Sequence, residues 1–150
     1  MSAVREGGSP TLKTDLDPVF TPETQPYWEG VEQGELRLCT CRACGHCFFP
    51  PSNICSACAS KEIEWRAASG RATLYSFVIN PSADERWGID GPMSVAMVKL
   101  EEGPMMLSTV VNCPQTVEAL QFDMELRVTF RPYGNLRNVV CFEPVAQNVG

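Results

Sequence analysis

Six of the eight cysteines in this chain lie within residues 39–58, and this cluster restricts the possible folds more than any other feature. Paired Cys-x-x-Cys knuckles let two backbone turns direct four thiolates toward one tetrahedral ion, which is the coordination that structural zinc prefers. Two such pairs can be drawn, with ten residues between them: Cys41 with Cys44, and Cys55 with Cys58. The spacing therefore predicts one zinc ion per chain, bound by these four residues.

The residue after each knuckle helps to choose the pairing. Gly45 follows the first pair, and glycine readily adopts the positive φ with which a knuckle turns back. This favours Cys41 and Cys44 as the pair over Cys44 and Cys47. Ala59 occupies the equivalent place after the second pair and fits that conformation less well.

The chosen pairing leaves Cys39 and Cys47 as surplus cysteines of the cluster. We expect them to be small packed thiols, with reserve ligation or oxidation sensing as the alternatives. A rubredoxin-type iron site would use the same four-cysteine geometry, so iron stays open as the metal. Four thiolates leave no position for water, and we therefore expect the metal to hold structure rather than to catalyse a reaction.

Composition and charge limit the remaining classes of protein. With 150 residues, 44% of them apolar, the chain is long enough for one compact domain or for a small module attached to one. It has no apolar run near the roughly 20 residues that span a bilayer, and its first residues lack the apolar centre of a signal peptide. We therefore expect a cytoplasmic protein, in which paired cysteines bind metal more often than they form disulfides.

Three regions follow one another along the chain. Residues 1–23 are expected to form an N-terminal arm. Residues 24–70 would hold a short helix over residues 24–34, with Thr24 as its cap and Gly34 as its stop, and then the zinc ribbon. Residues 71–150 are rich in β-branched and aromatic residues, with turn formers between the segments. The expected strands cover residues 71–80, 93–100, 105–113, 124–133 and 137–145.

Five strands after a small metal module indicate a mainly β chain that ends in a small closed barrel. The five-stranded OB fold is the leading fold, and an SH3-like barrel is the alternative. Gly103 and Pro104 predict a tight hairpin between the second and third strands.

The sequence offers no arrangement typical of catalysis. Its single histidine, His46, lies in the first knuckle, where neighbouring side chains point apart, and we expect it at the surface or beside the metal ligands. Cys113 and Cys141 fall in expected strands and are interpreted as packed thiols. No residue is therefore assigned a catalytic role.

A nucleic-acid surface on the barrel is the main alternative interpretation. Arg127, Thr129 and Arg131 share one strand face, and Tyr75 and Phe77 could offer stacking rings. Yet residues 71–150 carry six Lys or Arg against nine Asp or Glu, and the whole chain has a net charge of −6, so the basic footprint of such a binder is missing. A solvated or intersubunit face is favoured.

The order of motifs resembles an acyl-CoA-associated family that joins a rubredoxin-like zinc ribbon to a C-terminal OB fold. The resemblance covers about residues 27–144. It rests on "PYWEGVEQGEL", "CRACG", "FFPP", "CSAC", "EWRAASGRATLYSF" and "VAMVKLEEG". Members of that family look like partners of thiolase-superfamily enzymes, including thiolases, steroid side-chain aldolases and an acyltransferase.

The resemblance implies a function for the chain. It would be a non-catalytic subunit of a hetero-oligomer, such as a heterotetramer, whose partner carries the catalytic group and acts on acyl-CoA. Thiolase and retro-aldolase chemistry stay equally open. It also implies zinc ligation by the four residues of the two knuckles. An independent binder of single-stranded nucleic acid is the alternative function, and a small electron carrier is a weaker one.

Large apolar side chains suggest where a partner docks. Trp28, Phe48, Phe49 and Trp87 offer more apolar surface than a lone helix and two irregular stretches readily bury, and aromatic residues are favoured interface anchors. The alternative is that they seal the seam between ribbon and barrel. Arg86 would be available for a phosphate of CoA.

Overall fold

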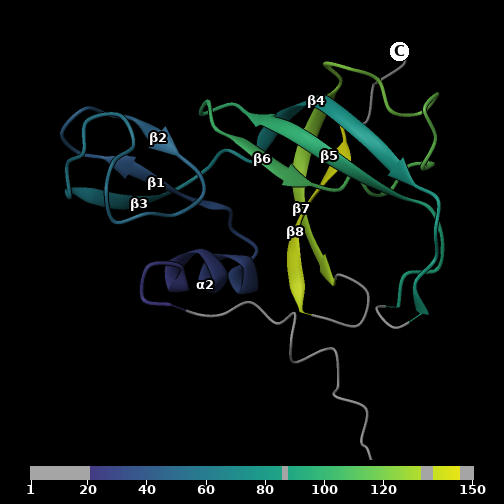
Figure 1. Cartoon of the computed structure of the whole chain (residues 1–150), viewed down its shortest axis with the longest axis horizontal. Coiled ribbons are helices and arrows are strands. Elements are labelled where there is room, and N and C mark those ends of the chain that lie inside the picture. Colours follow the sequence, from purple (N-terminus) through teal and green to yellow (C-terminus); the bar gives the residue numbers. More distant parts are fainter. Residues whose placement is uncertain (1–20, 86–87, 133–136, 146–150) are drawn as a thin grey trace, which may run out of the picture.

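The computed structural model describes residues 21–85, 88–132 and 137–145. Within these ranges the chain is mainly β, with one short helix, a three-stranded sheet and a five-stranded sheet (Figure 1). Most of the expected N-terminal arm lies outside the described residues. So do Arg86 and Trp87, whose predicted roles therefore receive no structural description.

Helix α2 (Gln25–Gln33) confirms the expected helix. Its first turn contains Pro26, and it ends at Gly34, which has a φ of 74° and donates its N–H to the carbonyl of Val31. Thr24 occupies the N-cap position, but its side chain makes no capping hydrogen bond and instead accepts one from the N–H of Thr21. Thr24 is therefore the N-cap residue, as predicted, but its side chain does not cap the helix.

The three-stranded sheet holds the cysteine cluster. Its strands are antiparallel, in the order β2 (Cys47–Phe48), β1 (Arg37–Cys41) and β3 (Ile63–Ala67). β1 pairs with β3 along its whole length, from Arg37 opposite Ala67 to Cys41 opposite Ile63. β2 is only two residues long and has no signature in the sequence.

The five-stranded sheet forms the barrel. Its strand order is β6, β5, β4, β7 and β8, with antiparallel pairing throughout. A parallel bridge between Val110 and Phe142 then joins the two edges, because the N–H of Val111 donates to Phe142 at 2.8 Å and the N–H of Phe142 donates to Thr109 at 3.0 Å. The strands are β4 (Arg71–Asn80), β5 (Met93–Leu100), β6 (Met105–Ser108), β7 (Glu125–Pro132) and β8 (Asn138–Pro144).

These bounds confirm the OB-fold prediction, with one shorter strand. The expected ranges 71–80 and 93–100 coincide with β4 and β5. The third strand was expected to reach residue 113, but β6 ends at Ser108 because the chain then leaves β5 to close the barrel against β8. Ser94, fully buried on β5, fixes this departure by accepting the N–H of Val110 at 3.0 Å and donating to its carbonyl at 3.1 Å.

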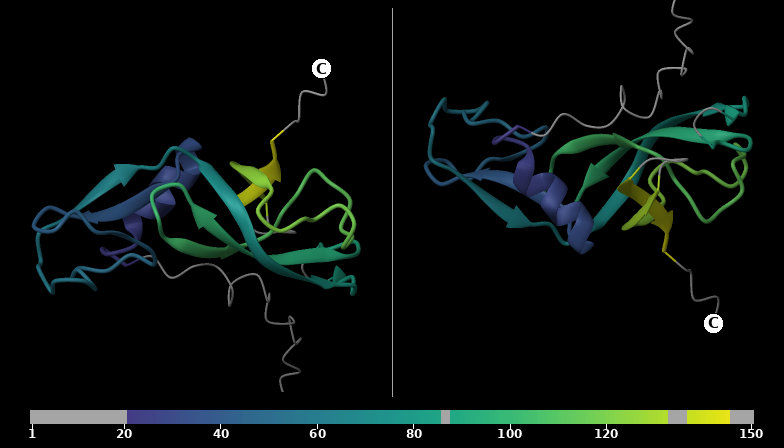
Figure 2. Two further views of the ribbon diagram at one scale, coloured as in Figure 1. Left: turned by 90° about the horizontal axis from the view of Figure 1, so that it is seen from above. Right: turned by 90° about the horizontal axis from the view of Figure 1, so that it is seen from below.

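Helix, ribbon and barrel share one hydrophobic core. Tyr27 and Val31 of α2 and Leu38 of β1 belong to the same buried cluster as Leu74 of β4 and Phe142 of β8. Figure 2 shows α2 where the three-stranded sheet meets the barrel. The chain between β3 and β4 crosses this junction at the buried residue Gly70.

Gly70→Ala is expected to destabilise the fold by about 2–4 kcal/mol, because two costs add. Gly70 has a φ of +84°, where a side chain is strained, and an added Cβ would lie 2.7 Å from Cγ1 of Val128. Gly34→Ala is the matched control: its φ is +74°, but nothing lies within 4 Å of an added Cβ, so it should cost only about 1–2 kcal/mol. Urea unfolding measures both. Equal losses would contradict the close approach of Val128.

Candidate metal centre

The first knuckle follows directly from β1. The carbonyl of Cys41 accepts the N–H of Gly45 at 2.8 Å, and the N–H of Cys41 donates to His46 at 2.9 Å. These two bonds fold residues 41–46 into a tight turn that brings Cys44 back beside Cys41. Gly45 has a φ of +77°, which is the backbone conformation that the sequence argument required of it.

The second knuckle repeats the same bonds fourteen positions later. The carbonyl of Cys55 accepts the N–H of Ala59 at 2.9 Å, and the N–H of Cys55 donates to Ser60 at 2.9 Å. Ala59 has a φ of +61°, so it adopts the left-handed conformation although it is not glycine. An alanine there costs on the order of 1 kcal/mol of strain, which the closed turn must offset.

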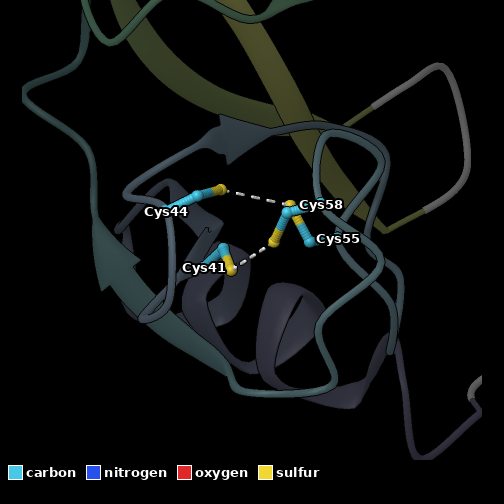
Figure 3. Close-up of side chains that lie close together, drawn as sticks. All are labelled: Cys41, Cys44, Cys55 and Cys58. Carbon is cyan, nitrogen blue, oxygen red and sulfur yellow. Dashed lines mark hydrogen bonds between the residues drawn. The ribbon is translucent and has the colours of Figure 1, made fainter.

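The two knuckles bring four sulfur atoms together. The Sγ atoms of Cys41, Cys44, Cys55 and Cys58 all lie within 4.8 Å of one another, and Figure 3 shows them pointing inward from the two turns. The pairs Cys41–Cys58 and Cys44–Cys55 are each 3.6 Å apart. A tetrahedral zinc site with Zn–S bonds near 2.3 Å needs edges of about 3.8 Å, so the donor set fits such an ion.

The thiols influence one another's protonation. The backbone N–H of Cys44 lowers the pKa of Cys41 to about 7, because it stabilises the thiolate. The N–H of Ser60 has the same effect on Cys58, but contacts with the sulfurs of Cys44 and Cys41 outweigh it and raise the pKa of Cys58 to about 12. Cys41 therefore ionises more readily than Cys58, and a bound cation would favour the thiolate form of both.

The surplus cysteines lie outside this group. Cys39 on β1 is buried, with 2% of its surface exposed, and Cys47 on β2 is half-buried. Burial is the main cause that raises the pKa of each thiol. Neither is among the four sulfurs that come within reach of one ion, so both behave as packed thiols.

The residues that could have served catalysis are poorly placed for it. His46 is exposed, and its ring stacks on Phe48 with the centroids 5.8 Å apart. Burial raises the pKa of Cys141 to about 11 and also raises that of Cys113. Both thiols are therefore protonated near neutral pH, and a protonated thiol is a weak nucleophile.

The predicted docking aromatics lie at the seam between helix and ribbon. The ring of Tyr27 contacts Trp28 at 5.0 Å and Phe49 at 5.6 Å, and both are half-buried against the core. Phe48 is only 7% exposed, so it offers almost no surface to a partner. Its assignment to a docking surface needs correction, because β2 places its side chain in the interior. For Trp28 and Phe49 the assignment stays a prediction.

The strand residues considered for nucleic acid do not form an open basic stripe. Arg127 pairs with Glu143 at 2.8 Å, and Arg131 donates to Asn112 at 3.4 Å. Tyr75 is exposed, but Phe77 belongs to the partly buried residues packed on the core, so the two rings do not form the expected platform. The reason is a register shift in β4 between Leu74 and Ser76, which turns Phe77 inward.

None of the helices within the described ranges has the length and apolar content that crossing a membrane requires.

Known proteins share both parts of this architecture. Residues 28–64 match the family description "ChsH2, rubredoxin-like zinc ribbon domain", and residues 65–131 match "ChsH2, C-terminal OB-fold domain". A solved structure titled "Ltp2-ChsH2(DUF35) aldolase" contains a chain that superimposes with a TM-score of 0.74 at 21% identity, covering 87% of this chain and all of that one.

Two curated relatives carry descriptive names. A "DUF35 domain-containing scaffold protein" of Methanothermobacter thermautotrophicus is 35% identical over 112 residues, which are 73% of this chain and 82% of that protein. The "3-oxo-4,17-pregnadiene-20-carboxyl-CoA hydratase alpha subunit" of Mycobacterium tuberculosis is 36% identical over 133 residues. That match spans 84% of this chain but only 42% of the mycobacterial subunit.

Proposed function

We propose that this chain is a zinc-bearing partner subunit of a thiolase-superfamily enzyme acting on acyl-CoA. It belongs to the ChsH2 family, which joins a rubredoxin-like zinc ribbon to a C-terminal OB fold. The observation that carries the proposal is the closed four-sulfur group in a ribbon that shares its core with the barrel. Such a site stabilises a fold and leaves the reaction to another chain.

Zinc would be held by Cys41, Cys44, Cys55 and Cys58. The ion supplies the positive charge that lets four neighbouring thiols ionise. All four of its positions would be filled by sulfur, so no position is left for water or substrate. The role of the metal in this proposal is therefore to fix residues 41–60 against β1 and β3.

The names of the relatives support an assembly with an enzyme. They describe a scaffold protein, a subunit of an acyl-CoA hydratase and a member of an aldolase complex. In our proposal the partner of this chain makes or breaks a carbon–carbon bond in an acyl-CoA, as a thiolase or a retro-aldolase does. The chain would stabilise that enzyme and shape its acyl-CoA entrance, with Arg86 as a contact for a CoA phosphate, in a complex such as a heterotetramer.

Affinity purification of the tagged chain after co-expression with its neighbouring genes tests the proposal. We expect one thiolase-like or aldolase-like enzyme to co-purify in a fixed ratio through size exclusion, and light scattering to give the mass of a hetero-oligomer. Recovery of the chain alone would contradict the proposal. Salt-sensitive binding of oligonucleotides would favour the nucleic-acid alternative, and a coloured, iron-containing protein would favour an electron carrier.

A further inference from the structure

The outer face of β4, β5 and β6 carries apolar side chains, although the solvent-facing side of an antiparallel sheet is normally polar. Val78 lies opposite Val95 on this face, and Met97 lies opposite Leu107. Val78 and Leu107 are 64% and 63% exposed, and Met105 is 37% exposed. These five side chains are here named the apolar face. The three strands that carry it lie side by side in Figure 1.

The hydrophobic core of the barrel is filled without the side chains of the apolar face. The inward residues of the same strands, Ala96, Val98 and Met106, are 0%, 0% and 4% exposed, so the interior is already filled. On the other half of the barrel, the outer face of β7 and β8 carries the ion pair between Arg127 and Glu143. Among the outer faces of the barrel strands, exposed large apolar side chains gather on β4, β5 and β6, which is the pattern of an interaction site.

The apolar face continues into a groove. Val95 and Leu107 also line a groove of about 340 Å³, which extends to Tyr27 of α2, Phe49 of the ribbon and Val139 of β8. The groove thus runs from the sheet to the seam between the helix and the ribbon. A surface that combines a flat apolar area with an adjoining groove can accept a protruding anchor side chain from a partner.

The groove contains a polar group without a partner. The side chain of Tyr27 is 8% exposed, and its hydroxyl makes no hydrogen bond within the described part of the chain. Burial raises the pKa of this phenol, so the hydroxyl stays protonated and can donate. The hydroxyl is not among the fully buried side-chain atoms that lack a hydrogen bond, so solvent reaches it. An acceptor on a docked protein would replace a water molecule there.

The net charge of the chain and the size of the apolar face indicate which kind of molecule binds there. Two copies of this chain each carry a net charge of −6 and repel one another, whereas Lys99, opposite Met105 at the border of the face, can attract a carboxylate of another protein. Three strands span only about 10 Å, and a stable interface covers about 800 Å² on each partner. The occupant must therefore use the face and the groove together.

We propose that the apolar face and its groove are the docking surface for the enzyme subunit of the complex. This inference rests on the proposed function and specifies where the partner binds. It also shifts the centre of the interface from the seam aromatics to the barrel strands, with Phe49 as the predicted docking residue that also lines the groove.

Aspartate substitutions test the surface against a matched control. Val78→Asp and Leu107→Asp place a charge in the interface and should weaken binding of the co-purifying enzyme at least a hundredfold. Val117→Asp is the control, because Val117 is 66% exposed, close to the 64% of Val78, but lies in the segment between β6 and β7. Its binding should equal that of the unchanged protein. Biolayer interferometry with the purified enzyme measures all three.

Smaller changes in polarity test the same surface if an aspartate substitution unfolds a strand. Val78→Thr and Leu107→Thr place β-branched side chains, which suit strands, at both positions and should each weaken binding about tenfold. Tyr27→Phe removes only the hydroxyl, so it should weaken binding about fivefold while leaving the thermal midpoint of the free protein unchanged. A role of Tyr27 in packing alone would leave binding by Tyr27→Phe unaltered.

The outcomes separate this inference from the proposed function. If the unchanged chain captures the enzyme and the face variants bind it equally well, the docking surface lies elsewhere and the proposed function stands. If the unchanged chain captures no enzyme, both fail. If the chain instead forms dimers that Val78→Asp disperses, the face binds a second copy and the inference is overturned.

Discussion

Cys44→Ser is expected to abolish tight zinc binding and to unfold residues 41–60. Structural zinc sites bind with about 10–16 kcal/mol, so the loss of one of four thiolates should lower the affinity by about a hundredfold or more. The knuckles have few buried side chains of their own to compensate, since Cys44 and Cys58 are both exposed. Elemental analysis measures the zinc, and amide hydrogen exchange measures the opening of the ribbon.

Cys47→Ser provides the matched control for this experiment. Cys47 lies three positions further along the same segment but outside the group of four sulfurs, so its replacement should leave the zinc content at one per chain. Loss of metal in this control, or retention of metal in Cys44→Ser, would contradict the assigned ligand set. Iron in the unchanged protein would replace zinc as the resident metal.

The isolated chain is expected to show no acyl-CoA lyase or acyltransferase turnover above background. Its candidate nucleophiles, Cys113 and Cys141, have thiols whose pKa values burial raises, so near neutral pH they are protonated. The complex with the partner enzyme should turn over substrate readily. Chromatography of the acyl-CoA substrate and its shorter acyl-CoA product, applied to the chain, the partner and the complex, measures the difference for either reaction.

Alanine variants test whether a thiol of this chain takes part in the reaction of the complex. Cys113→Ala and Cys141→Ala should leave the turnover of the assembled complex unchanged. Robust turnover by the chain alone, with loss of activity in either variant, would show that this subunit carries a catalytic thiol.

Local signals explain what could be predicted from the sequence. The knuckles depend on the spacing of cysteines and on one glycine, and Gly45 adopts the positive φ that this reasoning required. The ranges of β4 and β5 depend on runs of β-branched residues bounded by turn formers, and they coincide with the expected ranges. The hairpin at Gly103 and Pro104 has a similarly local cause.

The missed features depend on pairing between distant segments. An extra residue at Tyr75 shifts the register of β4, so Phe77 turns inward and Val78 turns outward, and nothing in the local sequence marks this shift. Phe48 is buried because the two-residue strand β2 pairs with β1. The apolar face is likewise visible only once the partners of Val78 and Leu107 are known.

The shared core sets a limit on how this chain can be divided. The two matched family regions meet between residues 64 and 65, which is inside β3 (Ile63–Ala67), and β3 pairs with β1 along its whole length. A cut at that point would remove part of a strand from one half and expose Leu38 and Val31 on one side and Leu74 on the other. The ribbon, the helix and the barrel are therefore joined by one continuous core and cannot be separated at that boundary without exposing it. A partner that contacted both the ribbon and the barrel would therefore depend on the packing of Tyr27 and Val31 between them, and a substitution in that packing could alter binding at a site that it does not touch.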